Sequence, residues 1–323
     1  MAEVAALVVT NIEQQQILHL ATQLEVSPQK QQEYCTQAGL LAADLPVRLR
    51  GRIEEFFSRS HGSALIISNL PMGTVPPTPQ GNSTHVGQGT LLARVQAIIN
   101  QRLGSMIAYE TQASGQLFHD LAPSIDEGSL QTSVSYDVEL DGHTEQCFSP
   151  LRPDFLSLAC LRSDPSAHTY IFPAVEITQC MSPDQRDRLF EPMWETGVDT
   201  SFRMLDQGFG LTATRGPISL LQGDYNEPFI TIDETLTKGL TVESQDLLDL
   251  VITLYRERRT KIVLVAGDLL ILDNKRSMHG RSSYPARLDG TDRFLLRTFI
   301  AQSGRAIEFA MRADSCVILA KYS

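Results

Sequence analysis

His143 and Glu145 stand two positions apart and carry two side-chain types that bind catalytic metals. The preceding run, residues 131–140, predicts extended chain, and in a strand two residues so spaced point to the same face. One imidazole and one carboxylate supply two of the three ligands of the facial arrangement in non-haem Fe(II) oxygenases. The pair alone is weak evidence, since 7 histidines and 38 acidic residues in 323 make a chance His-x-Glu common. The other interpretation is an exposed pair at a strand end.

A third metal ligand has to come from farther along the chain, where His168 and His279 are the histidines that follow Glu145. His279 comes soon after the strand-like run GDLLILDN and directly before Gly280. This setting favours a side chain that points into the mouth of a barrel. We expect His168, and His119 before the pair, to be structural.

Two arginines follow His279, at Arg293 and Arg297. On a predicted strand over 293–300 they share one face, and the opposite face is mostly apolar: Phe294, Leu296, Thr298 and Ile300. Arginines on the inward side of such a strand require anionic partners, because a buried unpaired charge is costly. Carboxylates are the obvious partners, since a guanidinium binds them with two parallel hydrogen bonds.

Taken together, these motifs resemble the clavaminate synthase-like family of Fe(II)/2-oxoglutarate oxygenases, which includes arginine and asparagine β-hydroxylases of peptide-antibiotic pathways. The resemblance rests on HTE at 143–145, on DNKRSMHGR at 273–281 with its two downstream arginines, and on GDYNEPF at 223–229. Glu in place of Asp in the first motif is a mark of this branch. The resemblance covers about residues 64–300, and the N-terminal helices fit by length alone.

Carried over residue by residue, the resemblance implies that His143, Glu145 and His279 bind Fe(II). It implies that Arg293 binds the distal carboxylate of 2-oxoglutarate, with help from the hydroxyl of Thr169. The implied cofactors are therefore Fe(II), 2-oxoglutarate as co-substrate, and O₂. No catalytic side chain beyond the metal ligands is implied.

The same resemblance implies a binding site for an amino acid. Arg297 would hold the α-carboxylate, and either Glu110 or Gln112 would receive the α-amino group. Ser133 falls where the family has a polar substrate contact, and Asp233 falls where relatives bind the polar end of the side chain. Ordinary strand, turn or surface roles are the alternatives for all of these residues.

The implied activity is hydroxylation of a free polar or cationic L-amino acid at C3, in specialised metabolism. Arginine-binding relatives carry a second acid where this chain has Thr231, so arginine is one candidate among several, with lysine, ornithine, citrulline, asparagine and a cyclic guanidine amino acid such as enduracididine. Desaturation, oxidative cyclisation and a carrier-tethered substrate remain alternative functions. A non-catalytic jelly-roll binding protein is the alternative from another class.

Composition limits the partners. The net charge is −11 and no Lys/Arg-rich run occurs, which argues against nucleic acid and anionic membranes as partners. No apolar run is long enough for a transmembrane helix, and the N-terminus lacks the pattern of a signal peptide. The five cysteines form no metal-binding or disulfide pattern, which favours the cytoplasm. We expect a monomer or homodimer that binds a small molecule.

The expected fold is α+β and mainly β. Helices are predicted over 11–24, from Pro28 to about 43, over 46–58 and over 91–103, and many short strands follow. We expect a single domain over 1–323: a helical N-terminal region at 1–60, and a double-stranded β-helix (jelly roll) core at 64–310 with a helical insertion at about 180–260. Within the insertion a helix is predicted from Pro183 to about Trp194, and near the end a strand is predicted over 306–311.

Overall fold

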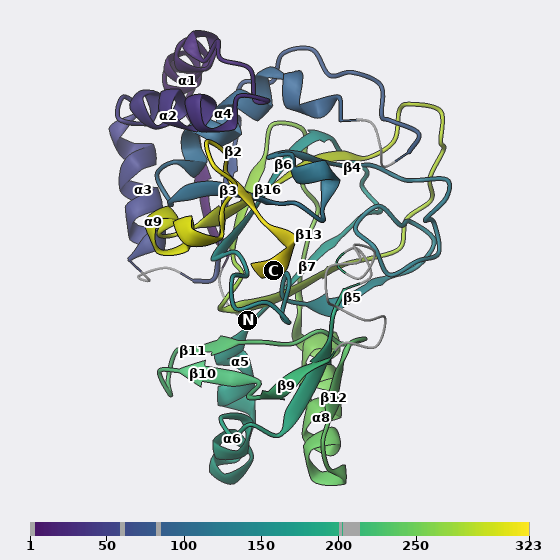
Figure 1. Ribbon diagram of the computed structural model, residues 1–323. Coiled ribbons are helices and arrows are strands. Elements are labelled where there is room, and N and C mark those ends of the chain that lie inside the picture. Colours follow the sequence, from purple (N-terminus) through teal and green to yellow (C-terminus); the bar gives the residue numbers. More distant parts are fainter. Residues whose placement is uncertain (1–3, 59–61, 82–84, 200–201, 203–213, 323) are drawn as a thin grey trace.

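The computed structural model describes residues 4–58, 62–81, 85–199, 202 and 214–322. Its largest sheet has eight strands and runs through the middle of the upper part of the molecule (Figure 1). Seven of them follow in the order β1 (Ala5–Val8), β2 (Ala64–Ser68), β14 (Leu269–Asp273), β6 (Phe155–Arg162), β16 (Phe294–Ala301), β3 (Ser105–Tyr109) and β17 (Val317–Ile318). The eighth, β4 (His119–Leu121), pairs with β16. Pairs β1–β2 and β3–β17 are parallel and the others are antiparallel.

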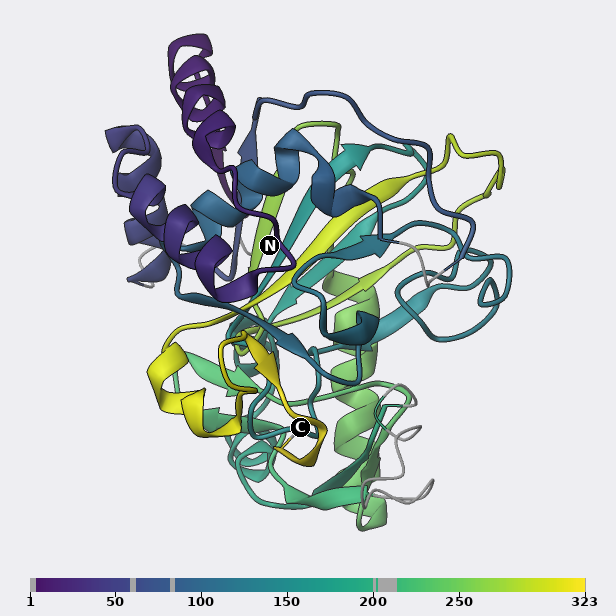
Figure 2. The ribbon, with the colours of Figure 1, turned by 45° about the horizontal axis from the view of Figure 1, so that its top comes forward.

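Helices cover one face of this sheet (Figure 2). They are α1 (Asn11–Gln23), α2 (Gln31–Ala42), α3 (Val47–Phe57) and α4 (Leu91–Asn100). Helix α4 lies against β6, and α1 and α2 pack on α4. The side-chain amides of Gln96 and Asn100 in α4 donate to Thr298 Oγ1 of β16, at 3.4 and 2.7 Å. Since side chains alternate along a strand, Arg297 is directed to the opposite face.

A second sheet packs on that opposite face. Its four strands are, in spatial order, β13 (Thr260–Ile262), β7 (Thr169–Pro173), β15 (Ser277–Arg281) and β5 (Leu140–His143). One apolar cluster joins the two sheets, with Leu158 and Phe299 from the large sheet and Ile171 from the small one. The two sheets therefore enclose a common interior, and the histidines of β5 and β15 lie on its wall.

The segment between β7 and β13 forms the lower part of the molecule in Figure 1. It contains α5 (Ala174–Cys180), α6 (Pro183–Leu189), β8 (Trp194–Gly197), β9 (Thr214–Ile218), β10 (Leu221–Gly223), β11 (Pro228–Ile230), β12 (Thr237–Gly239) and α8 (Val242–Arg258). Strands β12, β8 and β9 form a small sheet, and β10 pairs with β11. Trp194 and Tyr255 are fully buried in the separate core of this segment. The region that we predicted as a helical insertion thus holds strands as well as helices.

The C-terminal residues return to the large sheet. The turns and helices there are α9 (Gly304–Ile307), η3 (Glu308–Ala310) and η4 (Ala320–Tyr322), and two further 3-10 turns occur earlier in the described chain, at η1 (Gly87–Gly89) and η2 (Ala113–Gly115). The described residues hold about as much helix as strand, so the chain is mixed α/β and the expectation of a mainly β protein is wrong. In the part of the chain that the structure describes, no helix combines the length and the apolar character needed to cross a membrane.

Several predicted elements end or begin elsewhere. Helix α2 begins at Gln31, not at Pro28, because the Ser27 carbonyl accepts from the Lys30 amide at 2.9 Å and closes a separate turn first. The helix that begins at Pro183 ends at Leu189, because Trp194 starts a strand. Both errors concern boundaries, which local sequence signals specify poorly.

Two predicted strands are wrong. Residues 306–310 are helical turns, and Met311 forms only an isolated bridge with Ile318. The Ser303 hydroxyl caps the first turn by accepting from the Ala306 amide at 3.3 Å. Residues 131–139 form turns, and only Leu140 belongs to a strand. Backbone groups of these turns form hydrogen bonds within the segment. Arg281 also donates hydrogen bonds to the carbonyls of Ser135 and Val138. A β1 strand also precedes the N-terminal helices, which the predicted helical region did not include.

Candidate active site

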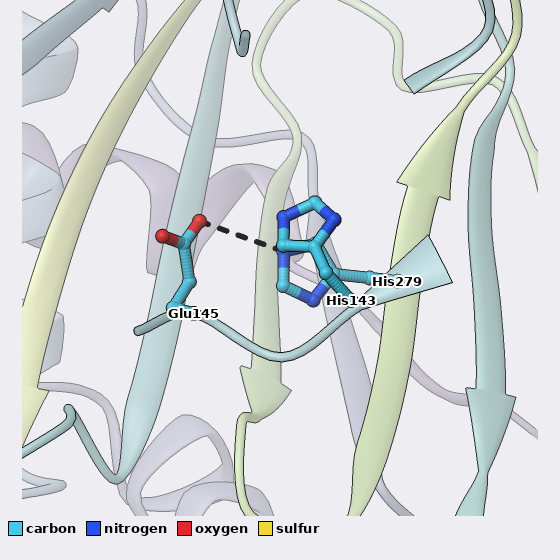
Figure 3. Close-up of side chains that lie close together, drawn as sticks. All are labelled: His143, Glu145 and His279. Atoms are coloured by element: carbon cyan, nitrogen blue, oxygen red, sulfur yellow. Dashed lines mark ion pairs between the residues drawn. The ribbon is translucent and has the colours of Figure 1, made fainter. Parts of the chain in front are cut away.

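His143 and His279 lie directly opposite each other on the paired strands β5 and β15. Their ring centroids are 4.4 Å apart (Figure 3). The carboxylate of Glu145 faces both rings, and one ligand atom from each of the three residues lies within 4.8 Å of the others. The structure thus brings together the three residues that the sequence resemblance grouped.

Glu145 does not lie on a strand, contrary to the alternation on which we based the pairing. Strand β5 ends at His143, and Glu145 begins a turn in which Gln146 has a φ of 53°. The turn is held by the buried side chain of Asn274, which accepts from the Glu145 amide at 2.7 Å and donates to the Glu145 carbonyl at 3.2 Å. The side chain reaches the histidines because Asn274 fixes this turn.

The ligand atoms of the three residues suit a divalent cation. His143 Nδ1 lies 2.8 Å from the Asp141 carbonyl, which can only accept, so Nδ1 donates and Nε2 is the ring nitrogen left for a metal. Burial, together with the neighbouring His143, lowers the pKa of His279 to about 4, so His279 is neutral near pH 7. Burial works to raise the pKa of Glu145, but Arg297 and the two histidines hold it well below its usual range. A nitrogen from each of two imidazoles and an ionised carboxylate fit Fe(II).

Both ring nitrogens of His279 are buried without a hydrogen-bond partner, although Nε2 approaches a Glu145 oxygen at 3.5 Å. A buried polar atom left unpaired is costly, and such cases are rare in native proteins. A cation bound between the three ligand atoms would use one of these nitrogens. The donor set and this unpaired ring both match a metal site.

A cavity of about 630 Å³ adjoins the three residues between the two sheets. Arg293, Arg297 and Thr169 line it, so the face that we predicted for the two arginines is correct. Thr169, the first residue of β7, lies opposite Arg281 of β15. Burial lowers the pKa of Arg281 to about 10, and the nearby charge of Arg293 contributes. Two buried guanidinium groups make this end of the cavity strongly positive and suited to a carboxylate.

Arg297 has two partners within the site. Its Nη1 lies 3.1 Å from a Glu145 oxygen, and its Nη2 lies 3.1 Å from Nδ1 of His119. His119 is buried in the cavity wall, a position that its sequence context did not indicate. The signal was weak, because only the pairing of β4 with β16 brings His119 beside Arg297.

The remaining predicted substrate contacts fall into two groups. Gln112, Ser133 and Asp233 line the cavity. Glu110 lies outside its lining: its carboxylate pairs with Arg312 at 2.5 Å and accepts from the Ala320 amide at 3.0 Å. Of the two candidates for the α-amino group, the structure therefore places only Gln112 in the cavity.

Asp233 belongs to the insertion and lies beside His143, with which it forms an isolated β-bridge. Its Oδ1 accepts from the amides of Thr235 and Leu236, at 2.9 and 2.8 Å. Burial raises the pKa of Asp233 and the negative charge of Asp199 raises it further, while His143 lowers it. Asp199 also lines the cavity, and no sequence argument had selected it.

The sequence matches the Taurine catabolism dioxygenase TauD, TfdA family over residues 93–299. The chain belongs to the TauD/TfdA family. The matched segment contains all three candidate metal ligands and both arginines. The protein is thus an enzyme, a dioxygenase that depends on Fe(II), 2-oxoglutarate and O₂.

Relatives within or close to this TauD/TfdA group support the resemblance seen in the motifs. The chain is 43% identical to L-lysine 3-hydroxylase of Catenulispora acidiphila, over 90% of this chain and 82% of that protein. It is 29% identical to clavaminate synthase 2 of Streptomyces clavuligerus, over 88% and 89% of the two chains. A crystal structure of asparagine oxygenase with Fe(II), 3-hydroxyasparagine and succinate superposes with a TM-score of 0.90, at 26% identity, over 97% of this chain and 99% of that one. The similarity to the clavaminate synthase-like group is confirmed.

Proposed function

We propose that this TauD/TfdA dioxygenase hydroxylates free L-lysine at C3. The observation that carries the proposal is the 43% identity with L-lysine 3-hydroxylase over nine-tenths of the chain. The cavity agrees with it, since a guanidinium (Arg297) and a carboxylate (Asp233) line the same space. An amino acid with a cationic side chain carries the complementary charges.

His143, Glu145 and His279 hold the Fe(II) in this proposal. The support is the convergence of the three side chains and the neutral ring of His279, whose nitrogens have no hydrogen-bond partner. Bound Fe(II) together with 2-oxoglutarate supplies the O₂ chemistry that oxidises an unactivated C–H bond. Arg293 binds the distal carboxylate of 2-oxoglutarate, and the hydroxyl of Thr169 donates to the same group.

Arg297 receives the α-carboxylate of lysine, with Gln112 at the α-amino group and Ser133 as a further polar contact. At the far end the ε-ammonium lies at Asp233, and Asp199 adds to the negative potential there. A cation between the two carboxylates offsets the desolvation of Asp233 and its repulsion from Asp199, which together raise the pKa of Asp233. These contacts hold the substrate at both ends and so fix which carbon faces the metal.

Thr231 supports lysine over arginine. It is buried, and its amide donates to the Leu220 carbonyl at 2.9 Å. A guanidinium is planar with five donors and is best matched by two carboxylates, whereas an ammonium is a compact point charge. The family resemblance implies a second acid at this position in arginine-binding relatives, and this chain has a threonine there.

We further infer that the two facing sheets are a double-stranded β-helix, or jelly roll. The support is their common apolar interior and the open cavity at its edge, where jelly rolls bind small ligands. The proposed setting is a reducing cytoplasm, as a monomer or homodimer. All five cysteines are free, which fits that compartment.

A mass-spectrometric screen tests the proposal. Purified protein with Fe(II), ascorbate, 2-oxoglutarate and air is incubated with each proteinogenic amino acid and with ornithine, citrulline and enduracididine. We expect lysine alone to gain one oxygen, in step with succinate, and NMR to place the hydroxyl on C3. Loss of two hydrogens instead would change the reaction to desaturation or ring closure. Oxygen gain in another amino acid would refute lysine and keep the reaction class.

A further inference from the structure

His119 and Arg297 face each other across the antiparallel pair of β4 and β16. Both are buried in the cavity wall, with 4% and 9% of their surfaces exposed. Arg297 Nη2 lies 3.1 Å from His119 Nδ1, and because a guanidinium can only donate, the imidazole accepts. This contact places the single ring proton of neutral His119 on Nε2.

His119 accepts a hydrogen bond from Arg297 without neutralising the charge of the guanidinium. Burial lowers the pKa of His119 to about 3, and the charge of Arg297 contributes, so the ring is neutral near pH 7. Glu145 already supplies one negative partner, at Nη1. A carboxylate in place of His119 would add a second, and the guanidinium would then have little attraction left for a ligand.

The geometry leaves donors free on Arg297. A guanidinium has five N–H donors, of which Glu145 and His119 take two. The Nε group has no hydrogen-bond partner. Three donors therefore remain, enough in number for the two hydrogen bonds that a carboxylate accepts from a guanidinium.

Phe299 fixes the arrangement. The His119 ring meets the Phe299 ring edge-on, with centroids 5.3 Å apart and an interplanar angle of 89°. The Arg297 guanidinium lies 4.9 Å from the centroid of the same ring. A side chain held by packing keeps its hydrogen-bond partner within a narrow range of positions, as a binding site requires.

We propose that His119 is a positioning residue: a neutral acceptor that holds the Arg297 guanidinium in place to receive the α-carboxylate of the amino-acid substrate. The inference rests on the proposed function, because it assigns the substrate carboxylate to Arg297. His119 itself touches neither the metal ligands nor the substrate in this assignment.

Three variants at one position test the role, with binding as the readout. His119→Leu removes the acceptor, His119→Gln keeps a neutral acceptor oxygen, and His119→Asp adds a charge. Each is loaded anaerobically with Fe(II) and 2-oxoglutarate, and binding of L-lysine and of L-lysinamide, which lacks the carboxylate, is measured by calorimetry. The matched control is His19→Gln, on the outer helix α1.

We expect His119→Leu to weaken L-lysine binding about 10- to 100-fold, the usual effect of losing a hydrogen bond to a charged group. L-lysinamide binding should change less than about threefold, because that ligand uses Arg297 little. His119→Gln should restore most of the lysine affinity, and His119→Asp should not. His19→Gln should match the unmodified protein.

Equal losses for both ligands in His119→Leu, or no loss, would overturn the proposal, as would a glutamine variant as weak as the leucine variant. A merely structural role predicts equal losses. Failure of the proposed function looks different, since the unmodified protein would then not bind lysine. If the screen identifies another amino acid, that compound and its amide replace the two probes. If no free amino acid binds, both proposals fall.

Discussion

The two ends of the cavity are built in different ways. At the metal end, His143 and His279 occupy opposed positions on paired strands, and the backbone hydrogen bonds of β5, β15 and β7 fix their spacing. At the substrate end, Gln112, Ser133 and Asp233 come from turns and from the insertion. A strand ladder fixes positions that the chemistry requires, and loops vary without disturbing it. The difference suggests that reaction type and substrate choice are separable in this protein.

The largest expected effect lies at Arg293, in the part of the cavity that Arg293 and Arg281 make positive. Arg293→Leu should raise the KM for 2-oxoglutarate roughly 150- to 5000-fold, because a buried charge pair that loses one partner costs about 3–5 kcal/mol. Succinate release at varied 2-oxoglutarate measures the change. The control Arg52→Leu, which alters a surface pair with Glu55 on α3, should leave the KM as it is. A normal KM in Arg293→Leu would show that another group, with Arg281 the nearest choice, binds the co-substrate.

The turn that carries Glu145 should be the most sensitive point of the metal end. Asn274→Ala removes two hydrogen bonds to Glu145 and one to the Pro153 carbonyl. We expect the affinity for Fe(II) to fall about 10- to 100-fold, as for other groups that orient metal ligands. Metal titration under anaerobic conditions measures it.

The matched control for that variant is Asn100→Ala. Asn100 is equally buried but bonds to Thr298 on the helix-covered face of the large sheet. Both variants should lower the free energy of unfolding by about 1–3 kcal/mol, since each leaves a buried polar partner unpaired. Only Asn274→Ala should lose iron affinity. Equal iron affinity in the two would mean that Asn274 contributes stability alone.

At the substrate end, Asp233→Asn should raise the KM for L-lysine about 10- to 100-fold, by loss of a charge-assisted contact to the ε-ammonium. The preference for lysine over norleucine, which has no ammonium, should fall with it. Kinetics with both substrates measure the ratio. The same change at Asp246→Asn, on the exposed side of α8, should leave the ratio unaltered. An unaltered ratio in Asp233→Asn would move the ammonium site to Asp199.

The same difference between the metal end and the substrate end explains which parts of the site could be predicted from the sequence. The convergence of His143, Glu145 and His279 was predicted from the HTE and DNKRSMHGR motifs through the family resemblance, and the structure brings the three side chains together. Even there the reason was partly wrong. Glu145 is placed by a turn and by Asn274, a contact between segments 129 residues apart that no local pattern specifies.

The substrate end was predicted less well, because its residues meet only in the folded chain. His119 reaches Arg297 through strand pairing across 178 residues, and Asp199 enters the cavity from the insertion. The segment at 131–140 was predicted as extended chain because its alternation suits a strand, but Arg281 binds its carbonyls and stabilises turns instead. Tertiary contacts override local preference most where the local signal is weak.

The smallest expected effect distinguishes Gln112 from Glu110, the two residues between which the sequence left the contact to the α-amino group open. Gln112 lines the cavity, whereas Glu110 anchors the C-terminal segment through Arg312 and Ala320. Gln112→Ala should raise the KM for lysine roughly fivefold to tenfold, the effect of one polar contact of about 1 kcal/mol or slightly more. Glu110→Gln should leave that KM alone and lower the melting temperature by about 1–2 °C, because a half-exposed pair and one backbone contact contribute about 1 kcal/mol. Steady-state kinetics and thermal unfolding of both variants measure the contrast. A raised KM in Glu110→Gln with normal stability would reverse the assignment, and would mean that the C-terminal segment moves to let Glu110 reach the substrate.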